Sequence, residues 1–397
     1  YSVLPADGVG DFTFSRGSSA TRINKDGLIE TVASGVSRLN YPLIDGVVNG
    51  CPSHLLEPER LQKIQYSEDF SQGYWNKSLI SVTPNNSVSP NGLQTADKIV
   101  SGNSTGNHFF RRTGLTYSAT NNTFSVFAKF TDDLFKEFHF VIYDGSNHFA
   151  YFDVKDGVVS SADSGITASM VNYGNGWYRC IVTYQTLSTS GGQIKVELGD
   201  STSVTGDGSS GMFFWGMQWE VSNYATSYIP NYGTAAGVTR SVETANGAGD
   251  STTFGSEGVL FAEISAFAND GTIRAISITD GTVSNIITVR YWATAGAAII
   301  QGLYVDGVGA TSQVSIFYPN ITNFAKIALS YQQGALKLYV NGVLEINVAL
   351  VVNDAINWNT LQFDIGNGTQ DFYGNVKQVQ SFNEVLTDAE LITLTTI

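Results

Sequence analysis

The stretch NTFSVFAKF (residues 122–130) decides the fold class, because its apolar side chains alternate along the chain. Side chains of an extended strand point to opposite faces in turn, so Phe124, Val126 and Ala128 share one face. An α-helix would instead need apolar residues at three- and four-residue spacing. The stretch therefore predicts a β-strand with one buried face.

The same alternation recurs on both sides of this stretch. Strand-like segments follow one another at roughly ten-residue spacing between residues 63 and 240, without helical segments between them, which favours an antiparallel sandwich. In the last segment, alternation predicts that Phe213, Trp215, Met217 and Trp219 lie on one side. The segments are EFHFVIYDG (137–145), HFAYFDVKDG (148–157), GNGWYRCIVTYQT (174–186), GGQIKVELGD (191–200) and MFFWGMQWEV (212–221).

A second β-block occupies residues 257–397, and a linker rich in Gly and Ser, residues 241–256, precedes it. Its clearest hairpin is ALKLYVNGVLEI (335–346), where Asn-Gly suits a two-residue type I′ turn. The one helical pattern follows Thr387, which forms a capping box with Glu390. The predicted fold is all-β, with two antiparallel jelly-roll sandwiches in tandem.

Residues 1–62 contain short extended pieces with Gly at intervals and no apolar stripe of helical spacing. A segment of this length and composition can hardly bury a core alone. We therefore predict an extended N-terminal collar that packs either on the next domain or on a neighbouring subunit.

Composition excludes several classes of function. The formal net charge is −14, and Lys and Arg form no cluster, so we expect no nucleic-acid partner. No apolar run reaches the roughly 18 residues of a membrane-spanning helix. Cys51 and Cys180 are far apart and lack a CxxC spacing, so we expect two free thiols, with a disulfide as the alternative.

Two stretches of the second block carry a resemblance to a known family. They are KLYVNGVLE (337–345) and DFYGNVKQVQSFNEVLTDAELITL (371–394). Both resemble the concanavalin A-like or laminin G-like jelly-roll family, in which such a hairpin and a final strand leading into a short helix recur. The resemblance implies the fold and leaves the function open, because that family includes lectins, adhesion modules, glycosidases and lyases.

Four stretches of the first part carry a second resemblance through their order and spacing. They are FTFSRGSSATRINKDGLIE (12–30), LLEPER (55–60), YSEDFSQGYW (66–75) and ATSYIPN (225–231). They resemble modules of tailed-phage virion proteins, the tail fibres and head spikes, although LLEPER usually continues there with Thr-Asn and here with Leu61-Gln62. The block between resembles a carbohydrate-binding jelly roll. The resemblance implies a location on the virion surface, contact with other virion proteins and host-surface polysaccharide, and a homo-oligomer, with a trimer favoured.

Sugar binding on a β-sandwich needs flat aromatic faces together with a few amides or carboxylates. Every candidate Trp is also compatible with a place in the core, and we expect Tyr74 and Trp75, in a turn-like stretch, to be exposed. The candidate carbohydrate-binding residues are Tyr74, Trp75, Asn76, Trp177 and Trp219, with Tyr178, Trp215, Asn175 and Gln218 as further members of the set.

Metal binding and catalysis have weaker signals. Four aspartates beside Gly or at strand ends are candidates for a structural calcium ion, although Asp-Gly is also common in turns. A jelly-roll glycosidase would need paired carboxylates, whereas Glu263 stands alone, so we expect no enzyme and no other cofactor. Arg111 and Arg112 are expected to form a solvated strand end. The candidate calcium ligands are Asp270, Asp280, Asp306 and Asp364.

The expected function is therefore a non-catalytic fibre or spike protein of a phage virion that displays two sandwiches for adhesion to host glycan. Two alternatives stay open. One is a secreted bacterial protein that binds or degrades polysaccharide, and the other is a virion protein without glycan affinity.

Overall fold

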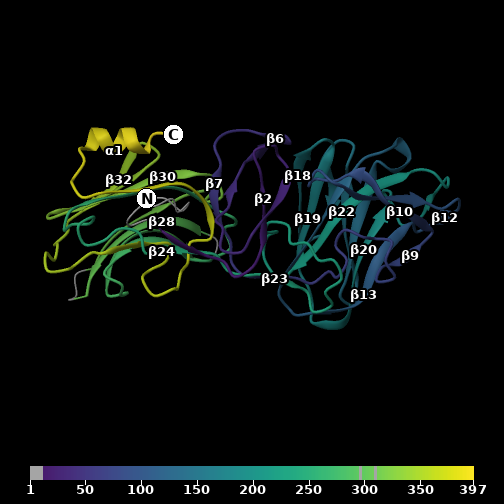
Figure 1. Cartoon of the computed structure of the whole chain (residues 1–397), viewed down its shortest axis with the longest axis horizontal. Coiled ribbons are helices and arrows are strands. Elements are labelled where there is room, and N and C mark those ends of the chain that lie inside the picture. The colour runs from purple at the N-terminus through teal and green to yellow at the C-terminus, as the bar shows by residue number, and fades with distance from the viewer. Residues whose placement is uncertain (1–11, 295–296, 308–310) are drawn as a thin grey trace.

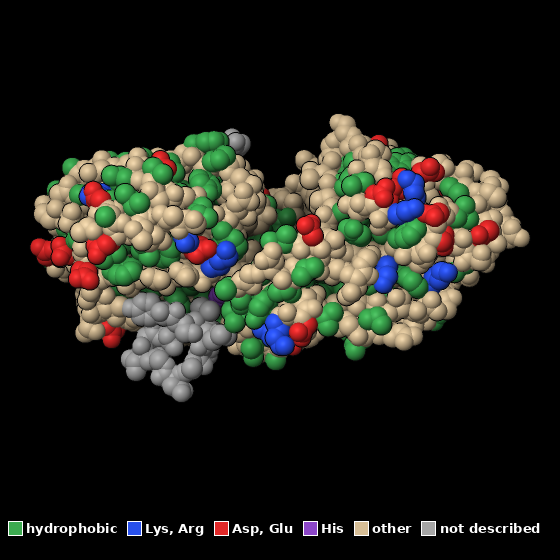
Figure 2. Space-filling model, turned by 90° about the horizontal axis from the view of Figure 1, so that it is seen from above, with side chains coloured by type: hydrophobic (Ala, Val, Ile, Leu, Met, Phe, Trp, Pro, Cys, Tyr) green, Lys and Arg blue, Asp and Glu red, His purple; other side chains and the backbone are tan. Residues whose placement is uncertain are grey.

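The computed structural model describes residues 12–294, 297–307 and 311–397, and in this part the chain is all-β with a single α-helix. Figure 1 shows two β-sandwiches side by side along the long axis, with the first strands of the chain between them. Figure 2 shows charged side chains as scattered groups on a mainly uncharged surface. No helix among the described residues has the length and hydropathy that a bilayer crossing demands.

The first sandwich consists of two six-stranded antiparallel sheets. We call the first the collar-side sheet, because the collar packs on its outer face, and the second the open sheet. The collar-side sheet has the order β10 (Ile80–Val88), β11 (Gln94–Ser101), β22 (Gly211–Glu220), β14 (Asn121–Lys129), β19 (Trp177–Gln185) and β18 (Ile166–Gly174). The open sheet has the order β17 (Val158–Ala162), β16 (Asn147–Asp153), β15 (Glu137–Tyr143), β20 (Thr189–Leu198), β13 (Phe109–Tyr117) and β9 (Asn76–Ser78). A bridge of β12 (Thr105–Gly106) with β21 (Val204–Thr205) and the 3₁₀ turn Asp133–Phe135 complete this module.

The second sandwich pairs a seven-stranded sheet with a five-stranded one, called the long and the short sheet here. The long sheet has the order β32 (Val343–Val348), β31 (Ala335–Val340), β30 (Ala325–Gln332), β25 (Gly258–Ala266), β34 (Gly374–Phe382), β7 (Ser53–Leu56) and β4 (Leu39–Asn40). The short sheet has the order β29 (Thr311–Phe317), β28 (Ala297–Asp306), β27 (Asn285–Thr294), β26 (Arg274–Thr279) and β33 (Thr360–Gln362). Helix α1 (Asp388–Thr395) packs on the outer face of the long sheet through Leu391.

The collar packs on its own chain, which is the first of the two alternatives that the sequence left open. Its strands β7 and β4 extend the long sheet of the second sandwich, where β7 pairs with β34. Its remaining strands form four two-stranded pairs, of which β2 and β6 are labelled between the two modules in Figure 1, where this part of the chain is drawn in purple. They are β1 (Thr13–Ser15) paired with β24 (Thr244–Asn246), β2 (Ala20–Ile23) with β3 (Ile29–Val32), β5 (Leu43–Ile44) with β6 (Val47–Val48), and β8 (Arg60–Gln62) with β23 (Val238–Arg240).

The expected linker, residues 241–256, is mostly built into the fold. Its strand β24 pairs with β1, and Ala245 and Ala248 belong to the core of the second sandwich. Ala248 also forms a β-bridge with Leu361. The Gly and Ser content predicted a flexible joint, but small side chains here allow the backbone to lie against the sandwich. Of this segment, Asp250, Ser251 and Thr252 form an exposed turn.

One alternation predicted from the sequence is wrong. Met217 and Trp219 face the core of the first sandwich, whereas Phe213 and Trp215 lie on the outer face of the collar-side sheet. The register of β22 against β14 slips by one residue between these pairs, and Gly216 has a φ of +66°. A β-bulge inserts one extra residue and so reverses the facing of every side chain beyond it.

Two local predictions in the second block are confirmed. Asn341 and Gly342 connect β31 with β32 and have φ values of 50° and 83°, as a type I′ turn requires. Thr387 caps α1, and Glu390 completes the capping box.

Candidate functional site

A polar joint lies where the collar meets both sandwiches. Arg38 donates to Glu57 at 2.8 Å and to Glu243 at 2.8 Å, and Arg16 donates to Glu243 at 2.7 Å. Arg240 completes the group through a 2.9 Å ion pair with Glu57. All five side chains are at most 2% exposed. Each carboxylate therefore pairs with two guanidinium groups in a place without solvent, which makes the pairs mutually dependent.

Ion pairing in this joint favours the ionised forms of Glu57 and Arg38. Burial by itself would raise the pKa of Glu57, but the guanidinium groups of Arg240 and Arg38 outweigh it and lower the pKa to about 2. Burial would likewise lower the pKa of Arg38, yet Glu57 and Glu243 raise it overall. Glu57 and Arg38 therefore stay charged over the physiological pH range, whereas burial lowers the pKa values of Arg16 and Arg240 from their usual value.

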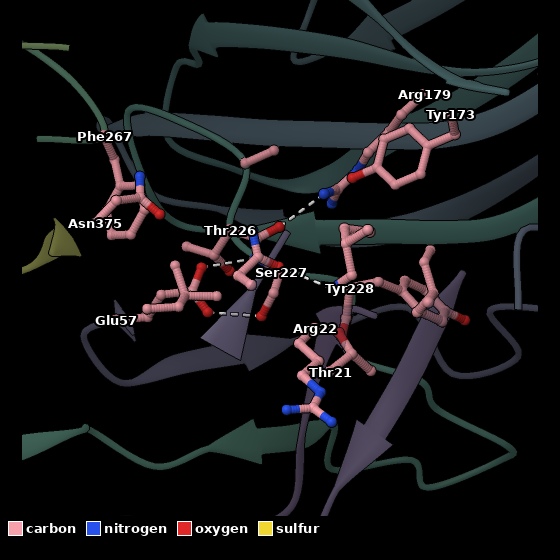
Figure 3. A pocket seen from close by; sticks show the side chains of 15 residues that line it. Thr21, Arg22, Glu57, Tyr173, Arg179, Thr226, Ser227, Tyr228, Phe267 and Asn375 are labelled. Carbon is pink, nitrogen blue, oxygen red and sulfur yellow. Dashed lines mark hydrogen bonds between the residues drawn. The ribbon is translucent and has the colours of Figure 1, made fainter. Parts of the chain in front are cut away.

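A cavity of about 200 Å³ borders the joint, and Figure 3 shows the side chains that line it. Ser227 donates its backbone N–H and its hydroxyl to Glu57 at 2.8 and 2.6 Å. Arg179 donates to the carbonyl of Thr226 at 2.7 Å, and Thr21 donates to the carbonyl of Tyr228 at 2.6 Å. These polar groups bind one another, so we assign the cavity to the structural joint between the modules.

The structure places the three Trp residues of the predicted sugar site in cores. Trp75 and Trp219 are 2% and 3% exposed and belong to the core of the first sandwich. Trp177, at 2%, packs on the outer face of the collar-side sheet beside Ile29 of the collar. None of them offers a ring face to a ligand. The expectation that Trp75 is exposed is wrong. Its indole N–H donates to the carbonyl of Tyr66 and holds the turn-like stretch around Trp75 against the core.

The other members of the predicted set lie in different places. Tyr74 is half-buried, and the guanidinium of Arg112 lies 4.3 Å from its ring centroid at the edge of the sandwich. Asn76 is exposed on β9 and pairs in register with Arg111 of the open sheet. Of the further members, Trp215 and Gln218 are buried, Tyr178 is half-buried, and Asn175 is an exposed turn residue with a φ of 53°.

Asn76 marks the edge of a surface that the sequence did not predict, the outer face of the open sheet. In one row of this open face, Tyr151, His139, Glu197 and Phe109 follow one another in register across β16, β15, β20 and β13. In the next row, Phe149, Val141, Lys195, Arg111 and Asn76 follow one another across β16, β15, β20, β13 and β9.

The open face combines rings with charges. Phe149 and Tyr151 stack at a centroid distance of 6.1 Å and an interplanar angle of 19°. The Lys195 ammonium and the Arg111 guanidinium lie 5.1 and 5.2 Å from the ring centroid of Phe109. These five side chains are all half-buried, so each of them is partly exposed to solvent. The face is thus amphipathic across several strands, as a pyranose ligand requires.

Charge in the middle of the face is locally balanced. Glu197 lies 2.5 Å from the Lys195 ammonium and 3.3 Å from Nε2 of His139. Burial would raise the pKa of Glu197, but the contacts with His139 and Lys195 outweigh it and hold the pKa below its usual value. Arg111 has no carboxylate partner among the described residues and donates only to Gln193, at 3.2 Å. Glu197 itself is 0% exposed, so its carboxylate balances charge inside the sheet, and Arg111 supplies the donors that remain for a ligand.

The four candidate calcium ligands are not brought together. Asp270 pairs with Arg274 at 2.9 Å, and Asp280 accepts hydrogen bonds from Thr282 within its own turn. Asp364 accepts a hydrogen bond from Asn246 at 2.9 Å, and Asp306 is buried at the end of β28. Within the described ranges, no three His, Cys, Asp or Glu side chains form a group that could hold a metal ion. The Asp-Gly sequences thus form turns here.

Cys51 is exposed, Cys180 is buried, and both are free thiols.

Comparisons with known proteins add structural neighbours only. Neither family models nor curated proteins match the sequence. The CBM40 of the Ruminococcus gnavus IT-sialidase is 15% identical and matches over 38% of this chain and 93% of that one, at a TM-score of 0.32. Domain 4 of AbnA, a GH43 extracellular arabinanase from Geobacillus stearothermophilus, is 13% identical. It matches over 39% of this chain and 73% of that one, at a TM-score of 0.33. Domains LG4-5 of the mouse laminin alpha1 chain are 10% identical. They match over 83% of this chain and 94% of that one, at a TM-score of 0.25.

These neighbours are carbohydrate-binding modules and laminin G-like β-sandwich domains. The fold class itself follows from the sheets of this chain. It is a protein of two antiparallel β-sandwiches, with a collar packed against both of them and one sheet face of the first sandwich presented to solvent.

The residues of the open face had a sequence signal that we did not use. In EFHFVIYDG and HFAYFDVKDG both alternating sets are apolar or aromatic, so one set had to face away from the core. Lys195 and Glu197 likewise alternate with core residues in GGQIKVELGD. The two arginines that we expected at a solvated strand end lie mid-strand on β13, with Arg111 on the open face.

Proposed function

We propose that the chain is a non-catalytic adhesion protein that binds glycan across the open face of the first sandwich. The observation that carries the proposal is that Phe109, Phe149 and Tyr151 share one partly exposed face with Lys195 and Arg111. Ring faces suit the C–H face of a pyranose, and the ammonium and guanidinium donors suit its hydroxyl oxygens. The opposite sheet is covered by the collar, so the open face is the side of this sandwich left for a ligand.

The biological setting in our proposal is the surface of a tailed-phage virion, where the chain would serve as a fibre or spike beside other virion proteins and contact host-surface polysaccharide. The order and spacing of the four collar and strand motifs support it. A shallow face gives weak single-site affinity, because each hydroxyl contact replaces one to water. Display as a homo-oligomer, with a trimer favoured, would raise the effective concentration of sites. A monodisperse monomer in light scattering would refute the oligomer.

The absence of catalysis is also part of the proposal. A glycosidase places two carboxylates on either side of the scissile bond, one of which donates a proton. Among the residues of the two rows described above, Glu197 is the only carboxylate, and its ion pairs with Lys195 and His139 favour its ionised form. Release of reducing ends from a bacterial polysaccharide by the purified chain would contradict this part.

A binding experiment with a matched control tests the site. The probe is a microarray of neutral and acidic bacterial oligosaccharides. Tyr151→Ala removes half of the stacked ring pair, and we expect affinity for the bound glycan to fall about tenfold, which corresponds to about 1.4 kcal/mol. Tyr232→Ala removes a ring that is 72% exposed outside the open face and should bind normally. Equal binding by the two variants would remove the open face from the function.

A further inference from the structure

Arg290 occupies the outer face of the short sheet, in the second sandwich. Its Nε donates to Oε1 of Gln301 at 2.6 Å, and its Nη1 donates to Oε1 of Gln370 at 3.2 Å. The guanidinium lies 4.2 Å from the ring centroid of Trp292, two residues further along β27. Two amides and one ring therefore fix the orientation of this side chain.

This arginine is buried without a counter-ion. It is 9% exposed, yet no carboxylate among the described residues forms an ion pair with it, and its Nη2 donates to none of them. Burial lowers the pKa of Arg290 to about 10, with no opposing charge to offset it. Four arginines are buried more deeply, at 2% exposure or less, and each of them pairs with a carboxylate: Arg16, Arg38, Arg240 and Arg274.

An unpaired buried cation is costly for a protein, and the cost is recovered when an anion binds. Arg179, which also lacks a carboxylate, differs in that its Nε and both Nη atoms donate to protein oxygens. Arg290 keeps Nη2 and part of Nη1 for another acceptor. Two parallel N–H groups of one guanidinium match the two oxygens of a carboxylate.

An apolar row lies directly beside Arg290 on the same face. Trp292, Ile299 and Phe317 are in register across β27, β28 and β29, and Phe317 is 67% exposed. The adjoining row holds Gln301 and Ser315, which are hydrogen-bonded to each other at 2.9 Å. A ligand on this face thus meets a cation, exposed rings and amide groups within two neighbouring rows.

We propose that this face is a second binding site, specific for a sugar acid whose carboxylate pairs with Arg290 while its ring packs on Phe317 and the edge of Trp292. Charge complementarity selects the carboxylate, and the exposed apolar row selects a ring in place of a bare anion. The site lies on the other sandwich and shares no residue with the open face, so it stands or falls independently of the function proposed above.

The tryptophans of the chain give this site its own signal. Five of the six Trp residues, all except Trp292, are at most 3% exposed. Titration of the full chain with sodium glucuronate should therefore change the fluorescence of Trp292 saturably and protect it from quenching by acrylamide, with a dissociation constant in the millimolar range typical of a single small ligand. Glucose should have no such effect. Trp292→Phe should remove the signal and so assign it.

Three variants test the residues. Arg290→Gln should weaken glucuronate binding at least tenfold, and Phe317→Ala, at an exposed position, should weaken it several-fold with no loss of folding. Arg22→Gln, which changes a collar arginine that pairs with Glu30 outside both faces, is the matched control and should bind glucuronate as the parent does. Circular dichroism checks that each variant is folded.

Several results would overturn the proposal. They are no saturable change with glucuronate, unchanged binding by Arg290→Gln or by Phe317→Ala, or equal binding of glucose. Titration with inorganic phosphate distinguishes a sugar-acid site from a site for any oxyanion. Phosphate that binds as tightly as glucuronate would overturn the assignment to a sugar acid.

Discussion

His54 is a buried histidine of the collar strand β7, next to the charged joint. It is 3% exposed, and within the described structure neither ring nitrogen has a hydrogen-bond partner. Burial, together with the positive charges of Arg38 and Arg16, lowers the pKa of His54 to about 3. The folded protein therefore holds this ring neutral at a pH where an unfolded chain would protonate it.

This burial predicts a loss of stability in mild acid. Between pH 6.5 and about 3 the unfolded state binds a proton at His54 and the folded state does not, so the free energy of unfolding falls as the pH falls. The slope from this one group is on the order of 1.4 kcal/mol per pH unit. In His54→Phe this contribution is absent, which urea denaturation from pH 7.5 to 5 measures.

The difference between the two proteins is the informative quantity. Burial raises the pKa of Asp97 to about 6, so its contribution has the opposite sign and increases stability as the pH falls from 6 toward 4. That contribution is common to both proteins and cancels in the comparison. Parallel curves for the parent and His54→Phe over pH 7.5 to 5 would contradict the assignment.

At the scale of elements, strand β7 links the start of the chain to its end. It lies between β34 and β4 in the long sheet, and both of its faces are buried. Leu56 at its end is fully buried in the core of the second sandwich. A strand from residues 53–56 thus completes a sheet whose other main strands begin at residue 258.

Leu56→Ala should consequently destabilise the second sandwich, although it is about 200 positions away in the sequence from most of that module. Loss of a buried Leu side chain leaves a cavity and costs about 2–5 kcal/mol. Leu61→Ala, at a position of β8 that is 37% exposed, is the matched control and should cost about 1 kcal/mol or less. Chemical denaturation followed by the fluorescence of Trp292 and Trp358, both in the second sandwich, measures the difference. Equal effects of the two substitutions would show that β7 is dispensable.

At the scale of the whole molecule, the two sandwiches are not independent domains joined by a flexible linker. The buried ion pairs of Arg16, Arg38, Glu57, Arg240 and Glu243 join the collar to the exit from the first sandwich. Phe12 and Ala245, both upstream of the second sandwich, pack in its core. The modules are therefore expected to stay together after the chain between them is cut.

A protease site inserted in the exposed turn at Asp250–Thr252 tests this. After complete cleavage, the two pieces should co-elute in size-exclusion chromatography and separate only in denaturant, because β7 remains in the long sheet. Release of a folded C-terminal piece of about 140 residues under native conditions would instead show that the sandwich holds without the collar.

Local chemistry determined what the sequence could predict by itself. Period-two alternation around Phe124 predicted strands, the Asn341-Gly342 pair predicted a type I′ hairpin, and Thr387 with Glu390 predicted the cap of α1. Each of these depends on backbone preferences and hydrogen bonds within a few residues. They were sufficient for the all-β class, and the length and composition of residues 1–62 predicted that the collar packs on something else.

Only the tertiary structure decided which aromatic residues meet solvent. Alternation says that a strand has two faces, but segments far away in the chain decide which face is covered. Ile29 of the collar helps to cover Trp177 and Trp215. The bulge at Gly216 places the aromatic side chains of β22 before and after it on opposite faces of the sheet. The open face and Phe317 beside the buried Arg290 remain exposed, because exposure of a side chain is a property of the whole packing and not of its neighbours in sequence.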